Sequence, residues 1–163
     1  MLEYEIHSVE EHQLPMCLDA LHAAFGESAK RFGYTKDSYP SSGAYVTLEE
    51  LSEAKRKGVH MYAACVEGGK VAGYVQLEKT DNGVYAFRRF AVLPEYQKLG
   101  IGRALVSHCR DRAKLYGGKK LTLLMINENE RLREFYESNG FRVISTTKDD
   151  SYPFEYSIME LIL

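Results

Sequence analysis

The chain has 163 residues, of which 45% are hydrophobic and 27% are charged, and its formal net charge is −2. These values are typical of a globular protein with a substantial core, and we expect a single domain over residues 1–163. The near-neutral charge argues against nucleic acid as a partner, and the lack of a run of about 18 apolar residues argues against a membrane-spanning helix. Three scattered cysteines indicate reduced, buried thiols in a cytoplasmic protein. Five histidines without metal-ligand spacing argue against a metal site.

The beginning of the chain predicts a strand followed by a helix. Residues 2–7 alternate apolar and polar side chains, as a short strand does. Ser8 and Glu11 have the spacing of a capping box. Apolar residues then recur at helical spacing as far as Phe25, and Gly26 is expected to end this helix.

Residues 26–46 form the least regular part of the sequence. Glycine, serine, proline and three tyrosines favour a loop. Loops of this length often line binding sites, so Tyr34, Tyr39 and Tyr45 are candidates for substrate contact. For any one of them, surface packing is the commoner explanation.

The rest of the chain alternates strand and helix signals. Thr47 and Glu50 predict the start of a second helix that Gly58 ends, and Gly68-Gly69 predicts a hairpin. The pattern indicates an α+β fold, with a mixed, mostly antiparallel central sheet of about seven strands flanked by about four helices. Strands are expected at residues 2–7, 61–67, 70–79, 87–93, 120–126, 141–146 and 154–163.

One stretch combines a strand, a glycine turn and a helix. Residues 87–93 predict a mostly buried strand that Pro94 ends. Gly100 and Gly102 lead into a helix that stops at Gly117. This geometry directs free backbone N–H groups and the positive end of a helix dipole at one point, which suits phosphate binding.

The stretch resembles the acetyl-CoA signature of the GNAT family of N-acetyltransferases. The family pattern Gln/Arg-x-x-Gly-x-Gly/Ala is matched by Gln97, Gly100 and Gly102, after a Val-x-Pro-Glu-Tyr phrase at residues 92–96. Residues 127–141 resemble the second motif of the family, in the expected order and separation. The resemblance covers residues 61–141 well and the first 60 residues poorly. It implies a three-layer α/β arrangement and acetyl-CoA as cosubstrate, without a metal.

By this resemblance, the pyrophosphate of coenzyme A lies at the glycine turn, and the pantetheine arm pairs with the exposed edge of the central strand. The backbone N–H of Val92 then polarises the thioester carbonyl. The alternatives are plain burial for the strand and an ordinary turn with solvated basic side chains for the glycines. The residues implied to bind acetyl-CoA are Phe90, Ala91, Val92, Gln97, Lys98, Leu99, Gly100, Ile101, Gly102, Arg103, Asn129 and Tyr136.

Two of these residues have competing interpretations. Asn129 matches the family asparagine that helps to position the cofactor, and its residue type also favours a helix N-cap. Tyr136 matches the family tyrosine that protonates the departing thiolate, against the alternative of a core tyrosine. A phenol of pKa ~10 is a weak acid toward a thiolate of ~8.5, so a hydrogen bond is an alternative to transfer of the whole proton.

The general base is not evident from the sequence. Many relatives carry a glutamate where this chain has Ala86, so Glu78 on the neighbouring strand, or an ordered water, is a candidate substitute. Arg88 and Arg89 are adjacent, and strand alternation would send them to opposite faces of the sheet. One of them could meet an anionic acceptor, although a surface salt bridge is the commoner role.

The resemblance implies an acetyl-CoA-dependent N-acetyltransferase that acts on a primary amine of a small molecule or peptide. The alternative is a non-catalytic acyl-CoA-binding or sensing module of the same fold. A nucleotide ligand is disfavoured because no Gly-x-x-x-x-Gly-Lys-Ser/Thr motif is present. The apolar residues 158–163 could form an internal strand or the interface of a homodimer.

Overall fold

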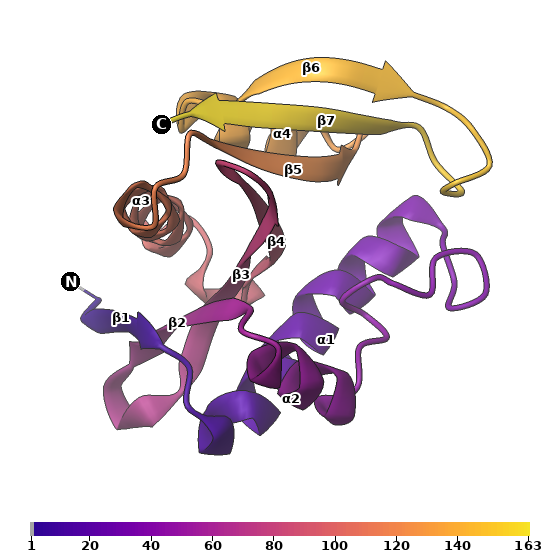
Figure 1. Cartoon of the computed structure of the whole chain (residues 1–163). Helices are drawn as coiled ribbons and strands as arrows, with labels where there is room; N and C mark the ends of the chain where they lie inside the picture. Colours follow the sequence, from indigo (N-terminus) through magenta and orange to yellow (C-terminus); the bar gives the residue numbers. More distant parts are fainter. Residues whose placement is uncertain (1) are drawn as a thin grey trace.

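A computed structural model describes residues 2–163, and in this part of the chain eleven regular elements build one sheet with helices on both faces (Figure 1). The sheet order is β1-β2-β3-β4-β5-β7-β6, which confirms the mixed seven-stranded sheet with four helices. No helix among these residues is long and apolar enough to cross a membrane. The elements are β1 (Tyr4–Ser8), α1 (Leu14–Phe32), α2 (Leu48–Arg56), β2 (His60–Val66), β3 (Val71–Asp81), β4 (Val84–Val92), α3 (Ile101–Leu115), β5 (Lys120–Ile126), α4 (Glu130–Ser138), β6 (Arg142–Thr147) and β7 (Tyr156–Ile162).

The two halves of the sheet are connected differently. Strands β1 to β4 pair antiparallel with their chain neighbours. The connection from β4 to β5 passes through α3, and the two strands pair parallel, because a parallel pair requires a crossover of this kind. Strand β7 then lies between β5 and β6, antiparallel to both. Residues 158–162 therefore belong to an internal strand, as one of the two interpretations of the segment 158–163 predicted.

Each face of the sheet has its own apolar core, because successive strand residues point to opposite sides. One core joins Tyr62, Val75 and Phe87 to α3, with Tyr136 from α4. The other joins Ala63 and Tyr74 to α1 and α2. The three cysteines are buried in these cores and are free. The result is a helix–sheet–helix arrangement, with α1 and α2 on one side and α3 on the other (Figure 1).

The first helix differs from its expected boundaries at both ends. Ser8 is the last residue of β1, so it does not cap a helix; Gln13 Oε1 instead accepts from the N–H of Glu10, 2.9 Å away, at the short 3-10 turn before α1. The helix continues past Gly26 and ends at Gly33, which has a φ of 72°. Gly26 did not end the helix because apolar residues downstream of it, such as Ala29, are also buried. The predicted loop therefore shrinks by its first seven residues.

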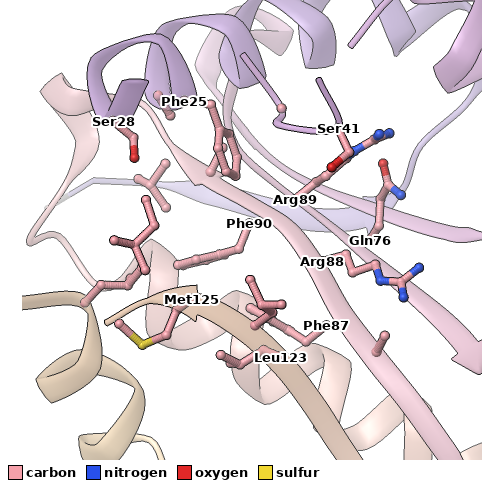
Figure 2. A pocket seen from close by; sticks show the side chains of 18 of the residues that line it. Phe25, Ser28, Ser41, Gln76, Phe87, Arg88, Arg89, Phe90, Leu123 and Met125 are labelled. Carbon is pink, nitrogen blue, oxygen red and sulfur yellow. The ribbon is translucent and has the colours of Figure 1, made fainter. Parts of the chain in front are cut away.

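A β-bulge interrupts the pairing of β3 with β4. Gln76 pairs with Arg88 and Tyr74 pairs with Ala91, so β4 has one residue more than β3 over this interval. Arg89 is the residue with left-handed backbone, at a φ of 50°. The extra residue shifts the alternation, and Arg88 and Arg89 lie on the same side of β4 (Figure 2). The expectation that they point to opposite faces was wrong for this reason.

Candidate active site

Strands β4 and β5 separate soon after they begin to pair. Their parallel pairing covers residues 84–86 of β4 and 120–122 of β5, and the described residues beyond these make no further pairs between the two strands. A cavity of about 1830 Å³ opens where the strands diverge. Its apolar wall contains Phe87, Phe90, Leu123 and Met125, as Figure 2 shows. The divergence thus turns the middle of the sheet into an open cleft.

The edge of β4 offers backbone groups to this cleft. The N–H of Leu93 donates to the carbonyl of Ala72, 2.9 Å away on the β3 side. Because neighbouring residues of an antiparallel strand direct their amides to alternate sides, the amide of Val92 faces away from β3 and toward the cleft. The Val92 carbonyl accepts from Gln97 Nε2 at 3.1 Å, and on this side of β4 the pairing with β5 ends at Ala86, so no described strand pairs with Val92 there. Of the three strand residues, Phe90 and Val92 are half-buried and Ala91 is buried.

The glycine turn lies at one end of the cleft. Lys98 and Gly100 have φ values of 64° and 91°, and the first backbone hydrogen bond of α3 runs from Ala104 to Gly100, at 3.0 Å. Within the described part of the chain, the six N–H groups of residues 98–103 have no hydrogen-bond partner. A turn with this many free donors at a helix N-terminus is suited to binding an anion.

Gly102 is required for close packing at the same place. A Cβ atom at this position would lie 3.0 Å from the ring of Phe135 and 3.1 Å from that of Phe90. These two rings stack with centroids 5.7 Å apart. Lys98 and Arg103 are exposed beside the turn and line the cavity. The other two residues of the segment do not line it: the side chain of Leu99 is exposed, and that of Ile101 is buried in the core.

The beginning of α4 holds the remaining predicted residues. Asn129 is the N-cap of α4, and its Oδ1 accepts from the N–H of Leu132 at 3.2 Å. It also lines the cavity, so a capping role and a place at the cleft occur together. Tyr136, two turns further along α4, is 5% exposed and packs edge-on to Phe87 at 6.0 Å.

The hydroxyl of Tyr136 is accessible from the cavity. It has no hydrogen-bond partner among the residues described, and the residue lines the cleft. Burial raises the pKa of Tyr136, because desolvation disfavours the phenolate. The side chain is therefore a core aromatic and, at the same time, a protonated donor that faces the cleft.

The position of the usual glutamate is apolar, as the sequence indicated. Ala86 is buried and pairs directly with Glu78 across the two strands. Glu78 forms an ion pair with Arg88, with 2.5 Å between Oε2 and Nη1, and it lines the cavity. The structure thus places a carboxylate on β3 opposite Ala86, in contact with an arginine.

The second wall of the cavity is aromatic and joins two loops. Tyr34 and Tyr39 line the cavity, whereas Tyr45 does not. Tyr39 packs against Tyr152 and Phe154 with centroids 5.3 Å apart in both cases. Burial, more than any nearby charge, raises the pKa of Tyr39 to about 12. The loop before α2 and the loop before β7 therefore close this end of the cavity together.

Several cavity residues were not anticipated from the sequence. Phe25 belongs to the apolar face of α1, and Phe154 was assigned to a strand. Gln76 had a signal, because it is the one polar residue within the apolar run of residues 71–77. A buried amide in such a run needs a polar partner, and this requirement would have marked it as a candidate.

Comparison with known proteins assigns the chain to a family. Residues 19–141 match the model of the acetyltransferase (GNAT) family. The chain therefore belongs to the GNAT acetyltransferases, whose cosubstrate is acetyl-CoA. A search of curated proteins found no match.

Solved structures of GNAT proteins share the fold over nearly the whole chain. The PaiA N-acetyltransferase of Thermoplasma acidophilum, in complex with coenzyme A, has a TM-score of 0.79 at 20% identity, over 99% of this chain and 100% of that one. A GNAT acetyltransferase of Staphylococcus aureus Mu50 has 0.78 at 19% identity, over 99% of both chains. A family member from Elizabethkingia anophelis with bound acetyl-CoA has 0.73 at 21% identity, over 98% of both chains. No group of three or more histidine, cysteine or acidic side chains in residues 2–163 is placed to hold a metal ion.

Proposed function

We propose that this protein transfers the acetyl group of acetyl-CoA to a primary amine of a small molecule or peptide, within one domain that spans residues 1–163 and acts in the cytoplasm. The observation that carries the proposal is the line of free donors through the cleft. It begins at the six unpaired N–H groups of residues 98–103, continues at the N–H of Val92 and ends at the hydroxyl of Tyr136.

The residues of the cleft fit coenzyme A. A diphosphate requires several N–H donors and a positive field, and the turn supplies both through its backbone, Lys98 and Arg103. An amide-bearing chain requires a free strand edge, and β4 has one beyond Ala86. Because Gly102 has no side chain, the stacked rings of Phe90 and Phe135 can pack directly against the turn. Asn129 caps the start of α4 and so helps to fix the position of Tyr136 two turns later.

Bound acetyl-CoA supplies an activated acetyl thioester. The N–H of Val92 is placed to donate to an oxygen that gains negative charge, the role of an oxyanion hole. Tyr136 is a hydrogen-bond donor for the leaving sulfur. Because burial raises its pKa, the phenol stays protonated at neutral pH and is a poor source of a whole proton. We therefore assign it hydrogen-bond donation rather than full proton transfer.

The acceptor amine loses a proton during the reaction, and Glu78 is our candidate to receive it. Glu78 is the carboxylate that the strand register places opposite Ala86. Its partnership with Arg88 orients the carboxylate, and its partial exposure leaves room for a water between it and the amine.

The direct test is release of free thiol from acetyl-CoA in the presence of a panel of primary amines, with the product mass recorded. We expect an acetylated amine in stoichiometric amount with free coenzyme A. Thiol release that does not depend on the amine would contradict amine acetylation.

The alternative function, an acyl-CoA sensor, is favoured by one observation: Ala86 lacks the carboxylate that many family members carry. A sensor would be protected against heat by acetyl-CoA and would release no thiol with any amine. The retained Tyr136, facing the cleft, favours the enzyme.

A further inference from the structure

We propose that the acceptor carries an acidic group beside its amine and that Arg89 and Gln76 bind this group. The proposal rests on the acetyltransferase function above and names its class of acceptor. Its structural support is a pair of polar donors, Arg89 and Gln76, that line the cavity. Neither residue belongs to the GNAT signature.

The first observation is the position of Arg89. The bulge in β4 turns Arg89 to the same side as Arg88 and Gln76, on the side of β4 opposite to Phe87 and Phe90 (Figure 2). Its backbone has a φ of 50°, a left-handed conformation that is unfavourable for a non-glycine residue. Strain of this kind is found mainly at functional sites. Without the bulge, the alternation of β4 would place this side chain on the face of the coenzyme cleft.

The second observation concerns charge. Arg88 is neutralised by Glu78, with 2.5 Å between the charged groups. Arg89 forms no ion pair with any of the described residues, and it is half-buried in the cavity wall. The aromatic hydroxyls around it, those of Tyr39 and Tyr74, are neutral because burial raises the pKa of both. The guanidinium therefore faces the cavity as an uncompensated positive charge.

The third observation is the buried amide of Gln76. This side chain is 4% exposed, and its Oε1 accepts from the hydroxyl of Tyr74 at 2.9 Å. With the oxygen engaged, the amide nitrogen has no acceptor in the described part of the chain, and the residue lines the cavity beside Arg88 (Figure 2). The nitrogen is not among the fully buried side-chain atoms of the described residues, so it is accessible from the cavity and free to donate to a ligand there. A bound carboxylate or phosphate would supply the missing acceptor.

The position of this subsite limits the size of the acceptor. Residue 89 precedes Val92 by three residues, roughly 10 Å along a strand. A guanidinium and a molecule of amino-acid size can fill this span together. The aromatic wall of Tyr39 and Phe154 then suits an apolar body. An aromatic α-amino acid combines the three features, and a phosphorylated amine shares the acidic group.

A polyamine is the opposing acceptor class, because acidic side chains also occur along the cavity. Glu27, Glu49 and Glu50 are exposed at its rim, where water and salt screen them. Glu50 accepts from the hydroxyl of Thr47, and Glu53 pairs with Arg56 and Lys57. The half-buried guanidinium of Arg89 is screened less by water and salt than these carboxylates. We therefore expect it to favour an acidic acceptor over a polyamine.

The test uses pairs of amines that differ only in the acidic group. Phenylalanine is compared with phenethylamine, phosphoethanolamine with ethanolamine, and spermidine represents the polyamines. We expect the acidic member of a pair to have a kcat/KM about 10- to 100-fold higher, the range of a charge-assisted hydrogen bond. Preference within the first pair identifies a carboxylate, and preference within the second identifies a phosphate. Equal rates within both pairs, or spermidine as the best substrate, would overturn the proposal.

Variants test whether the preference for acidic amines comes from Arg89 and Gln76. Arg89→Gln keeps an L side chain on the strained backbone but removes the charge, so the preference for the acidic member of each pair should fall to about one. Arg112→Gln removes the same charge from the exposed surface of α3 and should keep the preference. Gln76→Glu replaces the donor by an acceptor and should disfavour the acidic member. A preference that survives in Arg89→Gln would overturn the assignment.

A binding experiment separates this proposal from the proposed function. N-acetylphenylalanine should raise the melting temperature of the coenzyme A-loaded protein, and N-acetylphenethylamine should not. Loss of the shift in Arg89→Gln would support the subsite even if no amine were acetylated, in which case the acetyltransferase function alone would be wrong. Absence of a shift in the unaltered protein would overturn the subsite.

Discussion

Gly100 offers a test of the anion site in which charge is separated from backbone strain. Its φ is 91°, and a Cβ atom built on it would meet no atom within 4 Å. Any L residue at this position therefore has room but is strained, at about 1–2 kcal/mol. Gly100→Gln and Gly100→Glu share this strain and nearly the same size. They differ by one negative charge beside the free N–H groups of residues 98–103.

The effect of the charge follows from Coulomb's law. One pair of unit charges 4 Å apart interacts by about 1 kcal/mol in bulk water and by more in a partly buried site. A diphosphate carries about two such charges, so the Glu variant should bind coenzyme A more weakly than the Gln variant by at least about 2 kcal/mol. This corresponds to a factor of roughly 30 in Kd.

The assay is calorimetric titration of both variants with coenzyme A at low and physiological salt. The thermal midpoints of the two free variants should fall by similar amounts, since the strain is common to both. The difference in Kd should shrink as salt increases. Equal Kd values for Gly100→Gln and Gly100→Glu at low salt would refute the placement of the diphosphate at this turn.

Three further predictions follow from single residues. Tyr136→Phe should lower kcat about 10- to 100-fold, the value of one hydrogen bond to a charged group, and leave the Kd for coenzyme A unchanged; wild-type kcat would make Tyr136 a packing residue only. Gly26→Ala, inside α1 with open space at Cβ, should raise the free energy of unfolding in urea by about 0.5–1 kcal/mol, whereas Gly33→Ala, at a φ of 72°, should lower it. The pKa of Tyr39 is raised to about 12, above ~10 for an unfolded chain, so its contribution to stability is complete below pH ~10 and is lost toward pH ~12. Tyr39→Phe should make this alkaline loss shallower, and an unchanged slope would contradict the assignment.

The sequence was sufficient for those parts of the fold that depend on local patterns. The seven strands, the four helices and the strand–glycine turn–helix unit of β4 and α3 were expected, because apolar periodicity and glycine turns are local signals. The N-caps at Thr47 and Asn129 were recognisable for the same reason, and both accept the expected backbone N–H.

The failures share a physical cause, which is dependence on tertiary contacts. Gly26 reads as a helix stop in isolation, but burial of downstream residues continues the helix. The bulge at Arg89 depends on how β3 pairs with β4, and no local pattern marks it. The unpaired amide of Gln76 results from Tyr74 occupying its oxygen. A motif was thus enough to propose the coenzyme-binding residues, whereas the directions of the Arg88 and Arg89 side chains depend on the pairing of β3 with β4.

The insertion of β7 between β5 and β6 has a consequence for how the cleft forms during synthesis. Beyond residue 122, β5 pairs with β7 alone among the described strands, and β6 also pairs with β7. In a nascent chain that extends only to β6, β5 and β6 therefore lack the strand that lies between them. One wall of the cleft then depends on the strand that leaves the ribosome last of the seven. The binding of coenzyme A should accordingly begin only after that strand has emerged, late in the folding of the chain.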